Sequence, residues 1–316
     1  MFAKTNRPQP WLRRPLTVAA PTAPASVLVS RPETGVIKFF NNPQADPNRP
    51  DHSLFASCYK GMIVFPDATL SEIISRESLI GVPLQVQLQC LANYSNNNSR
   101  FIASVAPDYD ATNLAVPVPD ILDKTFCLLI DGQNFLRSLR SLDPKASAVA
   151  IIRRVEKMFY LSPQAVRLFI CPETSFDLQP QLTDIASGGL HNIEVVEYHQ
   201  QNVTVNRYSQ KTKSDVDPPI MAHIGALLHY SPISGLPAPE VLVLFCGDKD
   251  FKESLACWLG LMTDCSDYRH VGQHRHLVVV ASQAAMSKEL RELGNHLRAR
   301  LIFLEDLLIP KSWFVY

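Results

Sequence analysis

FCLLIDGQNFLRSL, residues 126–139, combines a continuous apolar strand with an acid at its end. A strand that is apolar at every position, rather than at alternate positions, is typical of a parallel sheet covered on both faces. The strand ends on Asp131, where a carboxylate is costly unless it is solvated, caps a helix or binds a metal ion. Apolar residues then return with helical spacing at Phe135, Leu136, Leu139 and Leu142. The segment predicts a strand–helix unit of a parallel α/β sheet, with an acid placed for function.

The same alternation of apolar strands and helical periodicity continues to the end of the chain, which predicts an α/β sandwich of five or six strands. Further strands are expected at 166–171, 192–198, 241–246, 276–281 and 300–304. Helices are expected at 146–160, 251–262 and 287–297, and from Pro218 and Pro219 onwards, since proline suits the first turn of a helix.

Acidic residues gather at the predicted ends of these strands. In an open parallel sheet, ligands bind beyond the carboxyl ends of the strands where the strand order reverses. Asp131 ends one strand, Asp248 and Asp250 follow another, and Asp217 opens a helix after a polar loop. Together these carboxylates would form a site that prefers Mg²⁺ or Mn²⁺, because hard cations take oxygen ligands. The alternative for Asp217 and Asp250 is that each only caps a helix.

The segment before this domain is rich in proline and then in short strands. Residues 1–32 read as a disordered, proline-rich tail and 108–123 as a linker, with the second domain at 124–316. Residues 33–107 hold strand patterns at 35–40, 53–59, 61–65, 83–90 and 100–106, several of them with two-residue alternation. We therefore expect a small five-stranded β-barrel before the α/β domain.

Three motifs in the second domain resemble the NYN branch of the PIN-like nuclease superfamily. They are LLIDGQNF, DVDPPIMAHI and VLVLFCGDKDF, in this order along the chain. The resemblance covers the region from Phe126 onwards and implies a PIN-like fold and metal-dependent RNA cleavage that leaves a 5′-phosphate and a 3′-hydroxyl. It implies metal-ligand roles for Asp131 and Asp248, with Asp217 and Asp250 completing the catalytic cluster and Asn134 supporting it.

The sequence departs from that family pattern at three positions. Cys246 stands where the family usually has serine, and His223 and Asn295 stand where many members have further acids. Fewer carboxylates imply weaker metal binding. His223 has two interpretations, a manganese ligand or an ordinary buried imidazole.

The first domain resembles a cold-shock-type OB barrel, a family that binds single strands through aromatic side chains on its outer face. The strand order GVIKFF, SLFASCY, GMIVFPDATL, GVPLQVQLQC and RFIASVA carries this resemblance, although the expected aromatic-rich glycine motif on the second strand is absent. It implies RNA-binding roles for Lys38, Phe40 and Phe55.

A basic polar loop precedes Asp217 and holds candidate phosphate contacts. Arg207, Lys211 and Lys213 are the nearest cations in sequence, and Tyr208 is available for base stacking. The alternative is a solvated surface loop.

A second polar segment, 267–276, contains three histidines. Three interpretations of this segment stay open: a zinc site, a basic loop that contacts RNA, and a loop without a function of its own.

Composition limits the possible functions. The formal net charge is zero, so nucleic-acid binding has to be local rather than driven by overall charge. Seven cysteines without a C-x-x-C pair indicate reduced thiols, and no apolar run is long enough to span a bilayer. We expect an intracellular, cytoplasmic protein without a membrane partner; the basic N-terminal residues leave a mitochondrial leader as the alternative.

These observations predict a metal-dependent endoribonuclease, a hydrolase of RNA phosphodiester bonds, whose OB-like module helps to bind single-stranded RNA. The alternative is a catalytically inactive PIN-like protein that binds RNA or another partner. A phosphatase of the haloacid dehalogenase type would need an early D-x-D pair, which IDGQN lacks. The RNA substrate and homodimer formation stay open at this stage.

Overall fold

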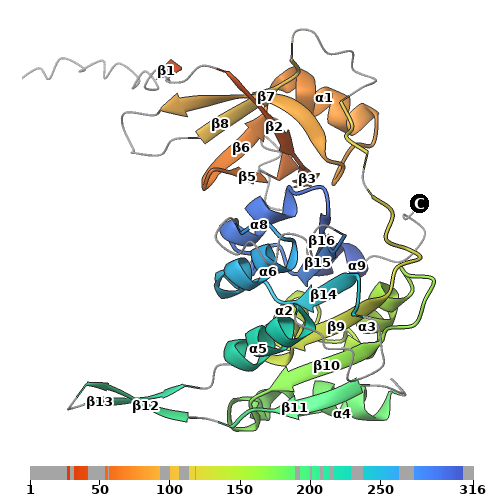
Figure 1. The fold of residues 1–316 in the computed structure, drawn as a ribbon, viewed down its shortest axis with the longest axis vertical. Coiled ribbons are helices and arrows are strands. Elements are labelled where there is room, and N and C mark those ends of the chain that lie inside the picture. Colours follow the sequence, from red (N-terminus) through yellow and green to blue (C-terminus); the bar gives the residue numbers. More distant parts are fainter. Residues whose placement is uncertain are drawn as a thin grey trace, which may run out of the picture.

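The computed structural model describes most of the chain, and all statements below concern these residues. They are 27–28, 32–41, 54–55, 57–92, 100–106, 114–117, 119–188, 193–199, 201–206, 209–213, 216–228, 238–262 and 274–308. The expected tail therefore lies largely outside the described residues. Within them the protein is a mixed α/β structure with two separate six-stranded sheets and two small two-stranded ones (Figure 1).

The first sheet is curled and mainly antiparallel, with the order β1-β7-β8-β6-β5, and β2 pairs with the other part of β7. β6 runs parallel to β8, while the β5–β6 and β7–β8 pairs are antiparallel. One helix, α1, crosses between β6 and β7. The elements are β1 (Val27–Leu28), β2 (Glu33–Ile37), β5 (Ser57–Tyr59), β6 (Met62–Pro66), α1 (Ala68–Arg76), β7 (Leu84–Ala92) and β8 (Arg100–Ser104).

Two short strands form a separate ladder at the side of the curled sheet that faces the second domain. β3 (Phe40–Asn41) follows β2 and pairs in antiparallel fashion with β4 (Leu54–Phe55), which precedes β5. The two ends of the curled sheet are thus linked by a small ladder. Leu70, Ile74, Val86 and Leu88 fill the space under the curl and are fully buried. The expected strands at 35–40 and 53–59 are therefore each split in two.

The second sheet has six strands, all parallel, in the order β11-β10-β9-β14-β15-β16. Numbered along the chain, this order is 3-2-1-4-5-6, so the direction of strand addition reverses between β9 and β14. The strands are β9 (Phe126–Asp131), β10 (Ala165–Ile170), β11 (Ile193–Glu197), β14 (Val241–Phe245), β15 (His276–Ala281) and β16 (Ala299–Phe303).

Helices cover both faces of this sheet, as the continuous apolar strands predicted. Alternate residues of β9 point to opposite faces: Leu128 packs into one hydrophobic core and Leu129 into the other. The first face is covered by α2 (Gly132–Leu142), α3 (Ala148–Glu156), α4 (Gln179–Ser187) and α9 (Leu304–Leu308). The second face is covered by α5 (Asp217–Leu228), α6 (Lys252–Trp258) and α8 (Lys288–Gly294).

Three 3-10 turns and a two-stranded arm lie beside the sheet. The 3-10 turns η3 (Pro172–Thr174) and η4 (Phe176–Leu178) follow β10, and η6 (Lys249–Phe251) follows β14. β12 (Gln201–Asn206) and β13 (Ser209–Lys213) form a two-stranded arm that extends away from the body (Figure 1). This arm occupies the segment that the sequence indicated as a polar loop.

The two domains meet across an interface built by β3, β5, α8 and β16. The ring of Phe40 packs edge-on against Phe303, with centroids 4.9 Å apart. The ammonium of Lys38 donates to the carbonyl oxygens of Gly294, His296 and Ala299. Lys38 is 3% exposed and Phe40 is 9% exposed, so both side chains lie within this interface and not on an open outer face.

Residues expected to form a linker pack against both domains. Leu114 is fully buried in the core of the first sheet, where its carbonyl accepts a hydrogen bond from Gln85. Ile121 is buried in the core of the second domain. Of the described helices, none is long and apolar enough to cross a membrane.

Candidate metal centre

The candidate site lies where β9 and β14 run side by side and the strand order reverses. Phe245 is in register with Ile130, so the chain leaves both strands at the same edge of the sheet. Asp131 is the last residue of β9, and Asp248 follows β14 by three residues. Neighbouring parallel strands with opposite crossovers leave a crevice at this edge. The topology therefore brings together acids that are far apart in the sequence.

Asp131 is buried beneath this edge, with 6% of its surface exposed. Its carboxylate caps α2 by accepting a hydrogen bond from the backbone N–H of Asn134 at 3.0 Å. Burial raises the pKa of Asp131, and the nearby charge of Asp248 raises it further, against the lowering effect of its hydrogen-bond donors. The sequence left three roles open for Asp131: a solvated acid, a helix cap or a metal ligand. The structure shows that Asp131 caps α2.

Cys246 links the two strand-end acids. Its thiol donates to Asp131 Oδ2 at 3.4 Å, and its sulfur accepts the backbone N–H of Asp248 at 3.4 Å. Burial, followed by the charge of Asp131, raises the pKa of this thiol well above its ordinary value. Cys246 is therefore a neutral thiol that orients the carboxylate of Asp131 and the turn at Asp248.

Two glycines allow the backbone to pass closely at this edge. A Cβ on Gly132 would lie 2.9 Å from the carbonyl oxygen of Phe169. A Cβ on Gly247 would lie 2.5 Å from the carbonyl oxygen of Ala285, and the carbonyl of Gly247 accepts the N–H of Ser287 at 2.8 Å. Since backbone atoms cannot move aside as side chains do, any larger residue at these positions would displace the acids next to them.

Asp217, Asp248 and Asp250 form the carboxylate cluster. One oxygen from each lies within 4.8 Å of the others, a spacing that one metal ion can bridge. Asp217 begins α5 and is buried, Asp248 is partly buried, and Asp250 is exposed. The N–H of Asp250 donates to Asp248 Oδ1 at 3.2 Å, so the turn itself orients the second carboxylate.

Asp131 lies outside this group of three, although its charge interacts with that of Asp248. Among the described residues, no lysine or arginine forms an ion pair with Asp131, Asp248 or Asp250. Of the four acids expected at the site, the structure thus groups Asp217, Asp248 and Asp250, and Asp131 lies behind them. Asn134 supports the site through its backbone N–H.

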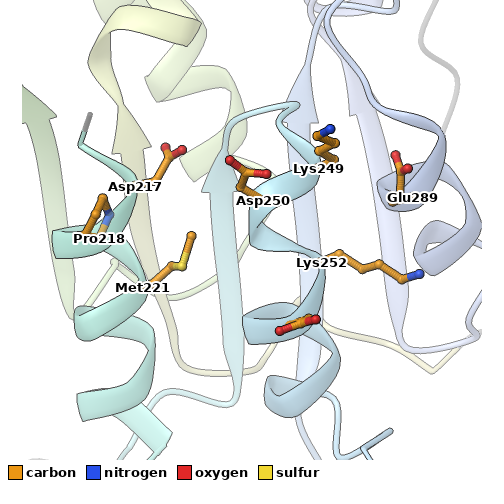
Figure 2. A pocket seen from close by; sticks show the side chains of 8 residues that line it. Asp217, Pro218, Met221, Lys249, Asp250, Lys252 and Glu289 are labelled. Atoms are coloured by element: carbon orange, nitrogen blue, oxygen red, sulfur yellow. The ribbon is translucent and has the colours of Figure 1, made fainter. Parts of the chain in front are cut away.

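A pocket of about 430 Å³, which we call the acidic trough, opens beside the cluster. It crosses from α5 over the η6–α6 turn to α8, and Figure 2 shows the carboxylates of Asp217 and Asp250 facing each other across it. Its lining contains four acids, two lysines and two apolar residues. They are Asp217, Asp250, Glu253, Glu289, Lys249, Lys252, Pro218 and Met221.

Glu253 and Glu289 are site residues that the sequence reasoning missed. Glu253 lies about one helical turn after Asp250, and residues at this spacing lie on the same side of a helix. This spacing could therefore have indicated Glu253 from the sequence. Glu289 lies in the first turn of α8, whose position over the trough follows only from the packing of α8 against α6 and β16. No local pattern could have indicated Glu289.

The imidazole of His223 contacts a neighbouring cation, the guanidinium of Arg167. Both imidazole nitrogens lie 2.7 Å from the guanidinium of Arg167, whose Nε in turn donates to Glu194 at 2.6 Å. Burial, and then the charge of Arg167, lower the pKa of His223 to about 4. A cation beside the partly buried imidazole opposes the binding of a second cation, which favours the interpretation of His223 as an ordinary imidazole over its interpretation as a manganese ligand.

Asn295 holds the two domains together. Its amide nitrogen donates to the carbonyl of Cys58 at 2.6 Å, and its oxygen accepts the backbone N–H of Lys38 at 3.2 Å. Both partners belong to the first domain. Asn295 therefore stabilises the interface between the two domains.

The remaining predicted RNA-binding residues are not tested by the geometry. Arg207 and Tyr208 lie outside the described residues, as does most of the segment 267–276. Lys211 and Lys213 lie on β13 and Phe55 lies on β4, but the positions of their side chains are not described. Of the three histidines, His276 is buried in β15 and has a pKa lowered to about 4, chiefly by burial.

Comparison with known proteins adds little to this picture. No protein-family model matches the chain, and no curated protein matches it significantly. Among solved structures, a protein of unknown function from Vibrio parahaemolyticus is similar, with 14% identity over 59% of this chain and 98% of that chain. The TM-score of 0.39 is too low to carry an argument about fold or function.

Proposed function

We propose that the protein is a metal-dependent endoribonuclease and that Asp217, Asp248 and Asp250 bind its Mg²⁺ or Mn²⁺. The observation that carries this proposal is the convergence of three carboxylates within 4.8 Å at the strand-order reversal. So many negative charges in one place repel each other, and a divalent cation offsets that repulsion. A PIN-like, NYN-type fold for the second domain is part of the proposal.

The chain's own groups would position the substrate. A bound divalent ion lowers the pKa of a water molecule and neutralises charge that develops on a phosphodiester. Asp131 and Cys246, behind the cluster, would hold the turn at Asp248 in place. The lysines at the trough would orient the phosphate group.

The first domain would assist by binding RNA, and we infer an OB-like fold for it. Supporting this, β6 lies parallel to β8, α1 lies between β6 and β7, and the β3–β4 ladder links the two ends of the sheet. An OB fold is a five-stranded, partly open barrel of this kind. With Lys38 and Phe40 buried in the interface, RNA contact would fall to other surfaces of this domain.

Cleavage of a labelled single-stranded RNA tests the proposal. We expect degradation in Mn²⁺ or Mg²⁺ and none in EDTA, with Asp248→Asn and Asp217→Asn each slowing it about a hundredfold or more. Asp123→Asn is the matched control, since Asp123 is exposed in the turn before β9, at the opposite edge of the sheet. RNA binding without cleavage would favour the alternative function, an inactive PIN-like RNA-binding protein.

A further inference from the structure

The acidic trough carries more negative than positive charge. Four carboxylates and two ammonium groups line it, and Asp248 adds a fifth carboxylate at its edge. The Debye length at physiological salt is about 8 Å, so the three carboxylates of the cluster, which lie within 4.8 Å of one another, act together on a ligand beside them. A phosphate chain entering the bare trough would be repelled, although two lysines are present.

Both lysines are nevertheless placed to contact phosphates. Lys249 and Lys252 are exposed on η6 and α6, and within the described part of the chain neither forms an ion pair. Figure 2 shows Lys252 extending from α6 toward α8, away from Asp217. The trough therefore has a cationic part next to the carboxylate cluster. One divalent cation bound at the cluster would reduce the net charge of the five carboxylates and two ammonium groups from three negative to one negative, which weakens the repulsion of a phosphate.

One wall of the trough is apolar. Pro218 and Met221 lie one turn apart on α5, and Figure 2 shows Met221 pointing from α5 into the gap beside α6. Thioethers make favourable contacts with aromatic rings, so this wall suits the face of a base. In duplex RNA the bases are stacked and their faces are covered, whereas single strands expose them.

We propose that the trough binds single-stranded RNA only when a divalent cation occupies the carboxylate cluster, with Lys249 and Lys252 contacting phosphates and Met221 contacting a base. This inference rests on the metal site of the proposed function. It adds that the cation is required for binding the substrate, in addition to cleaving it.

Fluorescence anisotropy of a short labelled single-stranded RNA tests this with the full chain in Ca²⁺, which takes the same oxygen ligands as Mg²⁺. We expect binding about tenfold tighter in Ca²⁺ than in EDTA at matched ionic strength, and little binding of the corresponding duplex. Lys249→Ala, Lys252→Ala and Met221→Ser should each weaken binding in Ca²⁺ several-fold. Lys145→Ala, at an exposed position beyond the other end of α2, is the control.

Asp250→Asn provides a readout that a merely unstable variant would not give. Removing one negative charge should strengthen RNA binding in EDTA, because repulsion falls, and weaken it in Ca²⁺, because a cation ligand is lost. A folded variant that changes in the same direction in both conditions would overturn the inference. So would equal binding by the parent protein in Ca²⁺ and EDTA, or equal binding of duplex and single strand.

The outcomes separate this inference from nuclease activity. Cation-dependent binding without cleavage in Mn²⁺ would support the trough assignment and reject the endoribonuclease. Cleavage in Mn²⁺ together with cation-independent binding would keep the endoribonuclease and reject the trough assignment.

Discussion

Asp131 shows how one buried carboxylate can stabilise local structure and still cost stability overall. It caps α2 and accepts a hydrogen bond from the thiol of Cys246, yet its burial favours the neutral acid. Residues that hold a functional site in place commonly carry such a cost. At the scale of single residues, we therefore expect the fold to become more stable when a buried carboxylate of this site is replaced by a neutral amide.

Asp131→Asn should raise the thermal stability at neutral pH, because asparagine keeps the cap to Asn134 without a buried charge. The pKa of Asp131 is higher in the folded than in the unfolded protein, so its penalty is present above that raised pKa and disappears as the pH falls below the ordinary value. The gain should therefore shrink in acid. Melting curves at several pH values would show this, and a variant less stable than the parent at neutral pH would contradict it.

His223→Ala should leave the affinity for Mn²⁺ within about threefold of the parent, because its imidazole is engaged by Arg167. Asp217→Asn, at the start of the same helix, should lower that affinity at least tenfold. Isothermal titration with Mn²⁺ compares the two variants directly. Equal losses would show that His223 is a ligand and that our assignment of the cluster is incomplete.

At the scale of elements, the turn between β14 and η6 determines where the cluster forms. Gly247 lies between Cys246 and Asp248, and the backbone at Ala285 leaves no room for a side chain there. The N–H groups at Asp248 and Asp250 then set the direction of the turn. The proposed metal centre thus depends on a close backbone approach as much as on the acids themselves.

Gly247→Ala should therefore weaken Mn²⁺ binding by about tenfold or more and lower the unfolding free energy by about 1–3 kcal/mol, since backbone atoms have to shift. Gly225→Ala on α5 is the matched control, because a Cβ there meets nothing within 4 Å. Titration calorimetry and thermal melts would measure both effects. A Gly247→Ala protein with the parent's metal affinity would argue against the turn as the organising element.

The sequence predicted the elements whose residue pattern directly reflects their burial. It missed the elements whose formation or position depends on contacts with residues far away in the sequence. β9, β14 and β15 are apolar at nearly every position because both faces of the sheet are covered, and that signal is unambiguous. α1, α4 and α9 went unnoticed, and the β12–β13 arm has the composition of a loop. The strand-end acids were found because their position relative to a strand is local, whereas Glu289 reaches the trough through the placement of α8.

At the scale of the whole molecule, the interface between the domains carries residues that look functional in the sequence. A lysine next to two phenylalanines resembles an RNA-binding strand, and only the second domain reveals that the lysine satisfies three carbonyl groups. Burial, and then the charge of Arg300, lower the pKa of Lys38 to about 8. The buried ammonium group of Lys38 therefore helps to fix the orientation of the first domain relative to the second.

Lys38→Met should lower the unfolding free energy at neutral pH by about 2 kcal/mol or more, because buried carbonyls lose their donor. The pKa of Lys38 is lower in the folded protein, so the parent's stability should gain from this group as the pH rises from about 8 toward the ordinary value, and the variant should lack that gain. Calorimetry, with the exposed Lys145→Met as control, measures both. An unchanged melting curve would contradict the interface role.

The most direct test of the account is a crystal structure of the protein soaked in Mn²⁺, with the ion located by its anomalous scattering. We predict one strong peak bonded to carboxylate oxygens of Asp217, Asp248 and Asp250, at about 2.0–2.4 Å, and its loss in Asp248→Asn. No peak at these residues in a crystal whose trough is open to solvent, or a peak held by other residues, would contradict the account.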